Sequence, residues 1–281
     1  MSRLLLCTDL DRTLLPNGPE PESEQARKIF HELVTHPQVT LVYVTGRHQQ
    51  LVKQVMDDYQ LPQPDYVIAD VGSTIYEVSG SGWHYQGAWE EVIDRDWQGK
   101  NANELHRLFG DIKDIQLQEL SKQNTHKLSY YAPLNIDYQK IISTMKQRLE
   151  QRTIRANLIW SVDQQANTGL LDVLPASAGK RQAIEFLMQQ LCFEYTETVF
   201  AGDSGNDICV LSSPIQSVLV ANADEGVRDE AIRQAQVNHQ DDTLYLARGN
   251  FMGMNGNYSA GILEGVAHYI PQAEHWLRGE T

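Results

Sequence analysis

The strongest constraint on the fold is a regular alternation of short apolar runs with segments of helical periodicity. Strands are predicted at residues 4–8, 39–44, 66–69, 170–174, 198–201 and 218–221. Helices are predicted, from apolar side chains at helical spacing, at residues 26–34, 51–59, 180–191, 224–235 and 259–269. Elements that alternate in this way form a parallel sheet covered by helices on both faces. We therefore expect an α/β fold with a doubly wound parallel sheet.

The middle of the chain follows a different pattern. Two short runs, 75–78 and 83–85, flank Ser-Gly-Ser-Gly and predict a β-hairpin. From residue 87 to 169 the chain is more polar and richer in Gln and Asn, with strands predicted at 112–117, 126–131 and 158–162 and a helix at 137–151. This change predicts a smaller α+β domain inserted into the core. We expect a core of residues 1–86 and 168–281 and an inserted domain of residues 87–167.

Composition excludes several classes of partner. The chain has 281 residues, with 23 Lys and Arg against 37 Asp and Glu, so its formal net charge is −14. Nucleic acids and anionic membranes select basic surfaces, and we expect neither as a partner. No apolar run reaches the ~20 residues of a membrane span, and the N-terminal apolar stretch is too short for a signal peptide. The three cysteines form no CxxC, so we expect a cytoplasmic protein with reduced thiols, as a monomer or weak dimer.

Polar clusters stand where several of the predicted strands end. DLDRT, at 9–13, directly follows the first strand, and TGR, at 45–47, follows the second. Lys180 begins a helix after Gly179, and GDSGND, at 202–207, follows the strand at 198–201. One carboxylate pair after a strand is also typical of a helix cap or a solvated turn. Because open parallel sheets bind ligands beyond the carboxyl ends of their strands, four such clusters favour a binding site.

The residue types in these clusters predict phosphoryl transfer. Asp9, Asp203 and Asp207 offer carboxylate oxygens, the ligands that Mg²⁺ prefers. An aspartate is also able to act as a nucleophile and form an aspartyl-phosphate. Its negative charge repels the phosphate, and Mg²⁺ together with Lys180 would cancel that repulsion.

Two further clusters complete the predicted chemistry. The hydroxyl and backbone N–H of Thr45 and the N–H groups around Gly46 are expected to hold the remaining phosphate oxygens. Asp11 is close enough in sequence to Asp9 to reach the leaving oxygen. We expect Asp11 to protonate that oxygen and then to take a proton from the attacking water.

At these residues the chain resembles the haloacid dehalogenase superfamily of phosphatases. DLDRT, VTGR, Lys180 and GDSGND are similar to its four motifs in order, and the insertion resembles its type 2 cap. Within the superfamily the chain is most similar to the sucrose-phosphate phosphatase family. The segments that carry this similarity are LLLCTDLDRTLL, PDYVIADVGSTIY, HKLSYYAP, LLDVLPASAGKRQA, AGDSGNDI and SAGILEGVAHY. One departure is Arg12, where close relatives are expected to carry Asn; we expect its side chain to face away from the metal.

The resemblance implies a Mg²⁺-dependent phosphatase that hydrolyses a sugar phosphate, sucrose 6-phosphate, through an aspartyl-phosphate. It implies Asp9 as the nucleophile and Asp11 as the acid and base. The implied metal ligands are Asp9, the backbone carbonyl of Asp11, Asp203 and Asp207, and the implied phosphate ligands are Thr45, Gly46, Lys180 and Asn206.

Two other functions are compatible with the same motifs. One is a phosphatase for another glycosyl phosphate, such as mannosylfructose phosphate. The other is a non-catalytic module that binds a sugar phosphate and associates with a synthase. Some sucrose-phosphate synthases carry a phosphatase-like domain, so such a synthase is a candidate partner. The presence of both Asp9 and Asp11 favours catalysis.

Residues of the inserted domain have two readings each. Lys127, on the predicted strand HKLSYY, would grip sugar hydroxyls if it points into the cleft, or lie on a solvated face. Four tryptophans lie in or beside the insertion, Trp83, Trp89, Trp97 and Trp160. Their rings would either form a platform for a disaccharide or fill the small hydrophobic core, and the second role is favoured.

Overall fold

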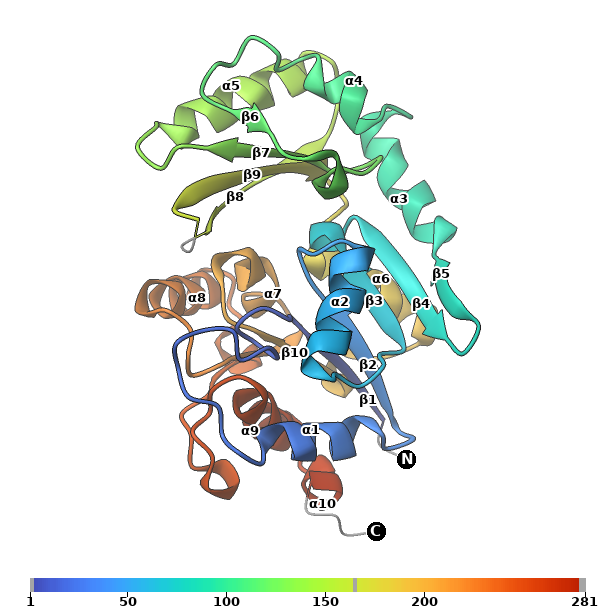
Figure 1. The fold of residues 1–281 in the computed structure, drawn as a ribbon, viewed down its shortest axis with the longest axis vertical. Coiled ribbons are helices and arrows are strands. Elements are labelled where there is room, and N and C mark those ends of the chain that lie inside the picture. The colour runs from blue at the N-terminus through green and yellow to red at the C-terminus, as the bar shows by residue number, and fades with distance from the viewer. Residues whose placement is uncertain (1–2, 164–165, 278–281) are drawn as a thin grey trace.

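An eight-stranded sheet forms the base of the computed structural model, which describes residues 3–163 and 166–277 (Figure 1). The strand order is β12-β11-β10-β1-β2-β3-β4-β5. The strands are β1 Leu4–Thr8, β2 Val39–Val44, β3 Tyr66–Ala69, β4 Thr74–Ser79, β5 Gly82–Tyr85, β10 Thr198–Gly202, β11 Gln216–Leu219 and β12 Leu244–Leu246. The strands from β12 to β3 pair in parallel, and the β4–β5 hairpin is antiparallel.

Helices cover both faces of this sheet because successive side chains of its strands point to opposite faces. On β1, Leu4 and Leu6 belong to one buried cluster, and Leu5 and Cys7 belong to another. The first cluster includes side chains of α1 Ala26–Val34, α2 Gln49–Tyr59, α9 Ser259–Tyr269 and α10 Ala273–Leu277. The second includes side chains of α6 Lys180–Leu191, α7 Ile208–Leu211 and α8 Glu225–Val237. The predicted doubly wound α/β core is therefore confirmed.

A smaller antiparallel sheet with helices on one face lies above the carboxyl edge of the core sheet (Figure 1). Its order is β6-β7-β9-β8, and we call residues 87–175, which contain it, the cap. The elements of the cap are α3 Gly87–Trp97, α4 Ala102–His106, β6 Gln116–Leu117, β7 Leu128–Ala132, α5 Tyr138–Glu150, β8 Ala156–Asp163 and β9 Thr168–Pro175. The predicted α+β insertion is confirmed as an architecture.

Two expectations about the insertion need correction, and one helix was not predicted. β9 pairs with β7 and β8, so the core resumes after Pro175 and not at residue 168. Of the strand predicted at 112–117, only the last two residues pair, as β6. The helix α3 was not predicted, and it belongs to both units: Trp89 and Ile93 pack in a core cluster, whereas Trp97 packs in the cap cluster.

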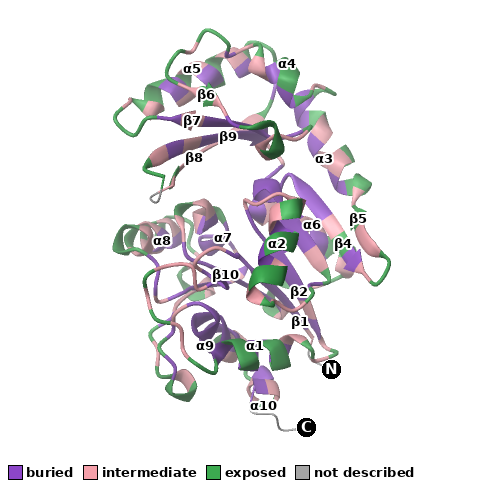
Figure 2. Cartoon of the chain, in the orientation of Figure 1, coloured by how far each residue is buried: buried purple, intermediate pink, exposed green. Residues whose placement is uncertain are grey.

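The segment that returns the chain from the cap to the core is short, and a side chain of the cap sheet holds it by hydrogen bonds. β9 ends at Pro175 and α6 begins at Lys180. The Asn157 side chain on β8 donates to the carbonyls of Ala176 and Ala178, at 2.9 and 3.1 Å. Figure 2 shows buried segments in the inner strands of both sheets and at the junction between them.

The tryptophans are structural. Trp89 and Trp97 are buried, at 2% and 0% exposure, and Trp83 packs against the core. Trp160 stacks on Tyr138 of α5 with ring centroids 4.6 Å apart, so it points to the helix side of the cap sheet. Within residues 3–163 and 166–277, no helix combines the length and apolar character needed to cross a bilayer.

Candidate active site

Polar residues from four segments meet at the carboxyl edge of the central strands. Strands β2, β1 and β10 are neighbours, so the residues that follow them, Thr45, Asp9 and Asp203, share one edge. The backbone N–H of Asp9 donates to the Ala201 carbonyl at 2.9 Å, which extends the strand pairing to the first site residue. Lys180, at the start of α6, reaches the same place. The motifs that are distant in sequence are thus brought together.

Lys180 lies at the centre of this arrangement. Its Nζ donates to Oδ1 of Asp9 at 3.0 Å, of Asn206 at 2.8 Å and of Asp207 at 2.7 Å. The residue is only 1% exposed. Burial acts to lower the pKa of Lys180, but the charges of Asp207 and Asp9 outweigh it and raise the pKa above its ordinary value. The ammonium group is therefore a permanent positive charge beside these carboxylates.

The position of Asp207 depends on a glycine. Asp207 is fully buried, and its Oδ2 accepts the backbone N–H groups of Asp203 and Ser204 at 3.2 and 3.1 Å. A Cβ on Gly202 would lie 2.6 Å from Cγ of Asp207. Residue 202 must therefore be glycine for the carboxylate to fold back over the end of β10.

Three buried carboxylates form a cluster next to Lys180. One oxygen from each of Asp9, Asp203 and Asp207 lies within 4.8 Å of the other two. Three carboxylates against the ammonium of Lys180 and the guanidinium of Arg12, 3.5 Å from Asp203, still leave an excess of negative charge in a buried site, which is costly without a counter-charge. A divalent cation would cancel the excess, and a donor set made only of oxygens suits Mg²⁺. These residues therefore fit the metal that the sequence predicts.

Burial also sets the proton affinity of the cluster. It raises the pKa of Asp203 to about 7, and the charge of Asp207 adds to this effect. Burial raises the pKa of Asp9 well above its ordinary value, although Lys180 opposes the shift. Raised carboxylate pKa values mean that protons compete with a metal for these oxygens near neutral pH.

Asp11 lies outside the carboxylate cluster, and Arg47 holds it. Arg47 donates through Nε and Nη2 to the two oxygens of Asp11, at 2.8 and 2.6 Å, and Asn17 Nδ2 donates to Oδ1 at 2.8 Å. Burial acts to raise the pKa of Asp11, but the Arg47 contacts outweigh it and lower the pKa. The predicted acid is therefore an ionised carboxylate in this structure. Arg47 is the third residue of the TGR motif, in which the sequence predicts a role only for Thr45 and Gly46.

The expectation for residues 45–47, which we call the phosphate loop after their predicted role, is wrong for one group. The backbone N–H of Thr45 donates to the Ile68 carbonyl at 2.8 Å, so it is occupied by strand pairing. The Thr45 hydroxyl oxygen accepts the N–H of Arg47 at 3.1 Å, which leaves its proton free to donate. Thr45 is fully buried, and Gly46 is half-buried beside it.

Arg12 also differs from expectation, because it faces the carboxylate cluster. Its Nε lies 3.5 Å from Oδ2 of Asp203, and its Nη2 donates to the Asn222 carbonyl at 3.0 Å. The backbone at Arg12 is left-handed, with φ 55°. This tight turn directs the guanidinium group back towards the carboxylate cluster.

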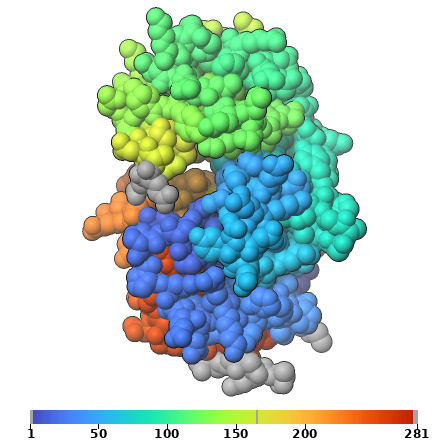
Figure 3. Space-filling model, viewed as in Figure 1, coloured from blue at the N-terminus to red at the C-terminus, as the bar shows by residue number. Residues whose placement is uncertain are grey.

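One face of the cap sheet looks towards these residues. Leu128 and Tyr130 of β7 pack under the cap helices, so Ser129 between them points to the other face. Ser129 is level with Asp172 of β9, to which its hydroxyl donates, and with Ile159 of β8, which packs against a core cluster. The space-filling view shows a hollow between the yellow edge of the cap and the core (Figure 3). The Ser129–Asp172 pair was not predicted, although Asp172 stands in the DVLP segment.

Lys127 precedes β7 on the cap. It is 6% exposed, so the solvated-face reading is wrong. The electrostatic influence of Lys127 reaches the core, because it lowers the pKa of Asp70, a buried residue after β3.

Comparison with known proteins agrees with this geometry. A sequence model of sucrose-6F-phosphate phosphohydrolase matches residues 2–270. A HAD-like hydrolase of Nitrosococcus oceani is 51% identical over 98% of this chain and 74% of its own length. Sucrose-phosphatase 1 of Nicotiana tabacum is 29% identical over 95% of this chain, which spans 59% of that protein. A mannosylfructose-phosphate phosphatase of Agrobacterium fabrum is 27% identical over 94% of this chain and 96% of its own length.

The fold agrees as well. The sucrose-phosphatase from Synechocystis sp. PCC6803, solved in complex with sucrose and phosphate, superposes with a TM-score of 0.76. It is 26% identical, and the match covers 96% of this chain and 98% of that one. With the family match over residues 2–270, the chain belongs to the sucrose-6F-phosphate phosphohydrolase family, within the haloacid dehalogenase superfamily of phosphatases.

Proposed function

We propose that this protein is a Mg²⁺-dependent phosphatase that hydrolyses sucrose 6-phosphate to sucrose and phosphate. The observation that carries the proposal is the buried group formed by Lys180 and the carboxylates of Asp9, Asp203 and Asp207. This group has the donors for a divalent metal, a permanent cation for the phosphate and a carboxylate at the end of the first strand.

Asp9 is assigned as the nucleophile. Its Oδ1 accepts from Lys180, so Oδ2 is assigned to attack phosphorus while the bond from phosphorus to the sugar oxygen breaks. Mg²⁺, when bound by Asp9, Asp203 and Asp207, supplies positive charge that offsets the repulsion between Asp9 and the phosphate. Lys180 and the Thr45 hydroxyl donate to phosphate oxygens, and water then hydrolyses the aspartyl-phosphate.

Asp11 is assigned as the acid and then the base. The sugar oxygen is a poor leaving group until it is protonated, and a positioned acid contributes about 10²–10⁴ in rate. Because Arg47 keeps Asp11 ionised, the pair must open before Asp11 takes up a proton. A phosphate dianion gives Arg47 another partner, so substrate binding favours that opening.

Recognition of the sugar is assigned to the cap. Lys127, Ser129 and Asp172 offer an amine, a hydroxyl and a carboxylate, which pair with sugar hydroxyls. A second sugar ring held here would supply binding energy remote from the phosphate, which aligns the reacting group.

A second candidate is a phosphatase for another disaccharide phosphate. The Agrobacterium fabrum relative acts, by its name, on mannosylfructose phosphate, and it matches this chain along nearly its whole length. The core chemistry would be the same, and the difference would lie in the cap.

The test is a phosphate-release assay with sucrose 6-phosphate, mannosylfructose phosphate and fructose 6-phosphate. We expect kcat/KM for sucrose 6-phosphate to exceed that for fructose 6-phosphate by about 10² or more, because only the disaccharide has a ring for the cap to hold. Lys127→Ala should shrink the ratio by slowing the disaccharide. Equal values would make the protein a general sugar phosphatase, and a preference for mannosylfructose phosphate would favour the second candidate.

The nucleophile is tested by Asp9→Asn. The amide is nearly isosteric, but it is a poor nucleophile and a weaker metal ligand, so phosphate release should fall below detection while the circular dichroism spectrum is retained. Turnover at the wild-type rate in this variant would exclude an aspartyl-phosphate on Asp9.

A further inference from the structure

The segment between β3 and β4 has an unusual backbone. Three successive residues, Asp70, Val71 and Gly72, have φ of 54°, 61° and 94°. Positive φ is strained for a carboxylate side chain and more so for a β-branched one. The strain is offset by two backbone bonds to the phosphate loop, from Asp70 N–H to the Arg47 carbonyl at 3.0 Å and from Val71 N–H to the Thr45 carbonyl at 3.1 Å. The Asp70 backbone is thus part of the support of that loop.

The Asp70 side chain serves none of the chemistry assigned above. It is 5% exposed, and its Oδ2 accepts the hydroxyl of Thr74 at 3.0 Å. Burial raises the pKa of Asp70, and the charge of Lys127 is the largest influence that opposes this shift. A buried carboxylate is costly unless a cation compensates it. Lys127 belongs to the cap, so the compensation comes across the junction.

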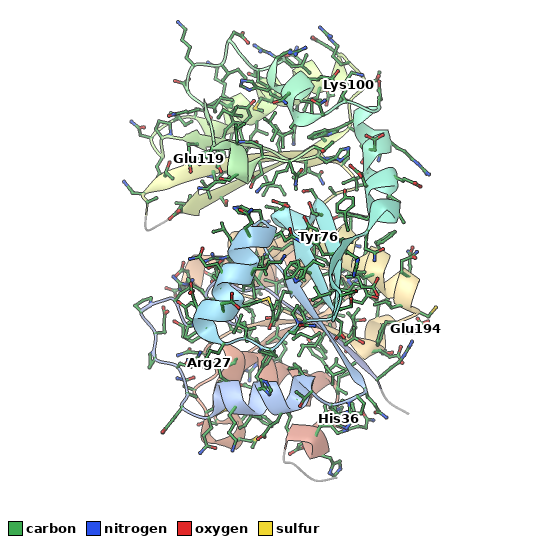
Figure 4. All side chains as sticks on the ribbon, turned by 45° about the vertical axis from the view of Figure 1, so that its right-hand side comes forward. Arg27, His36, Tyr76, Lys100, Glu119 and Glu194 are labelled. Atoms are coloured by element: carbon green, nitrogen blue, oxygen red, sulfur yellow. The ribbon has the colours of Figure 1, made fainter. Side chains whose placement is uncertain are left out.

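Hydrogen bonds also join the segment after β3 to the cap. Asn124 Nδ2 donates to the hydroxyls of Ser73 and Thr74, at 3.1 and 3.2 Å. The backbone of Asn124 pairs with that of Lys127 in both directions, at 3.2 and 3.4 Å. We call residues 124–127 the cap turn. Figure 4 labels Tyr76, two residues after Thr74, on the core just below the cap.

We propose that Asp70 is a positioning residue, which docks the cap turn on the segment between β3 and β4 and thereby fixes the ammonium group of Lys127. The proposal rests on the proposed function for the role of Lys127 towards the sugar. The docking itself stands on geometry: the Thr74 hydroxyl bonds Asp70 on one side and Asn124 of the cap turn on the other, and Asp70 and Lys127 are both buried. Through this docking, one side chain, Asp70, would set the distance between the phosphate subsite and the sugar subsite.

The first test needs no substrate. The full-length protein in Mg²⁺ is treated briefly with acetic anhydride, and acetylation of Lys127 is quantified by mass spectrometry. We expect Asp70→Asn to raise the labelling rate of Lys127 at least five-fold, because the ammonium group loses its counter-charge. The matched control is Glu77→Gln, an exposed carboxylate on the next strand, which should leave the rate unchanged. An unchanged rate in Asp70→Asn overturns the proposal.

A second variant covers the case in which Asp70→Asn does not fold. Thr74→Val removes the hydroxyl that bonds both Asp70 and Asn124, with little change in shape. It should raise the labelling of Lys127 by at least two-fold. No rise in a folded Thr74→Val protein would overturn the docking role.

The kinetic test separates positioning from general stability. On sucrose 6-phosphate, Asp70→Asn should raise KM about ten-fold and change kcat less than three-fold, and p-nitrophenyl phosphate should be hydrolysed within two-fold of wild type. In the Lys127→Met background, Asp70→Asn should have no further effect on KM, because it acts through Lys127. Additive effects of the two substitutions on KM would overturn the proposal.

The labelling and the kinetic experiments together distinguish the two possible failures. If labelling of Lys127 rises but sucrose 6-phosphate is not hydrolysed, the proposed function fails and the docking stands.

Discussion

Asp11 and Arg47 form the contact at the residue scale that most affects the chemistry. A bidentate arginine holds the predicted acid in its ionised form, with Asn17 as a third donor. The carboxyl is therefore unsuited to donate a proton until Arg47 moves. A leaving group that needs no proton should bypass this requirement altogether.

We predict that Asp11→Asn lowers kcat for sucrose 6-phosphate by about 10²–10⁴ and lowers it much less for p-nitrophenyl phosphate. The nitrophenolate leaves without protonation, so only the base step is lost. The measurement is steady-state phosphate release on both substrates. Equal losses on the two would mean that Asp11 is not the acid.

The sequence predicted the residues of the site better than their contacts. Asp9, Asp203 and Asp207 converge because they follow the ends of neighbouring strands, a property of local pattern, and Lys180 joins them from the start of α6. The occupied N–H of Thr45 could not be predicted, since it depends on how far β2 continues to pair with β3. These contacts are set by strand register.

At the scale of elements, the turn after β10 is fixed by close packing. Gly202→Ala should displace Asp207, which is held on both oxygens and has no room to retreat. We expect at least a ten-fold loss of Mg²⁺ affinity and about 1–3 kcal/mol lower free energy of unfolding, as for other overpacked sites.

The matched control is Gly205→Ala in the same motif, where an added Cβ would meet no atom within 4 Å. The measurements are Mg²⁺ titration of activity and denaturant unfolding. Wild-type metal affinity in Gly202→Ala would contradict the steric argument.

Two elements at the boundaries of the cap, β9 and α3, were not predicted correctly, and the reason is physical. β9 has buried side chains on both faces, with Leu171 and Val173 under the cap helices and Leu174 against a core cluster. A continuous apolar run is typical of a parallel core strand, so the sequence suggested the wrong sheet. The helix α3 was missed for a related reason, since its apolar residues are divided between two clusters.

At the scale of the whole molecule, the buried carboxylates couple stability to pH. The pKa of Asp203 is about 7 in the folded protein and lies near 3.9 in an unfolded chain. Because the folded value is raised, protonation favours the folded state, and this stability is lost as pH rises through 7. Bound Mg²⁺ would cancel the penalty on the ionised form.

We predict that the Tm of the chelator-treated protein rises by a few degrees between pH 8 and pH 6, about 1 kcal/mol. Saturating Mg²⁺ should raise Tm at pH 8 more than at pH 6. The measurement is scanning calorimetry, with Asp203→Asn as the control in which the pH dependence should be smaller. A chelated protein that is equally stable at both pH values would refute the shift.

The short return from the cap also limits how such enzymes diversify. Only four residues separate β9 from Lys180, and Asn157 of the cap sheet holds two of their carbonyls. An exchange of caps between relatives, in evolution or in the laboratory, therefore imports β9, a strand that only four residues separate from Lys180, so its register affects where Lys180 lies. A chimera joined at residue 168 would split a sheet, whereas one joined between Pro175 and Gly179 keeps each sheet whole. New specificities are most accessible through exchanges that join the chains within these four residues, 176–179.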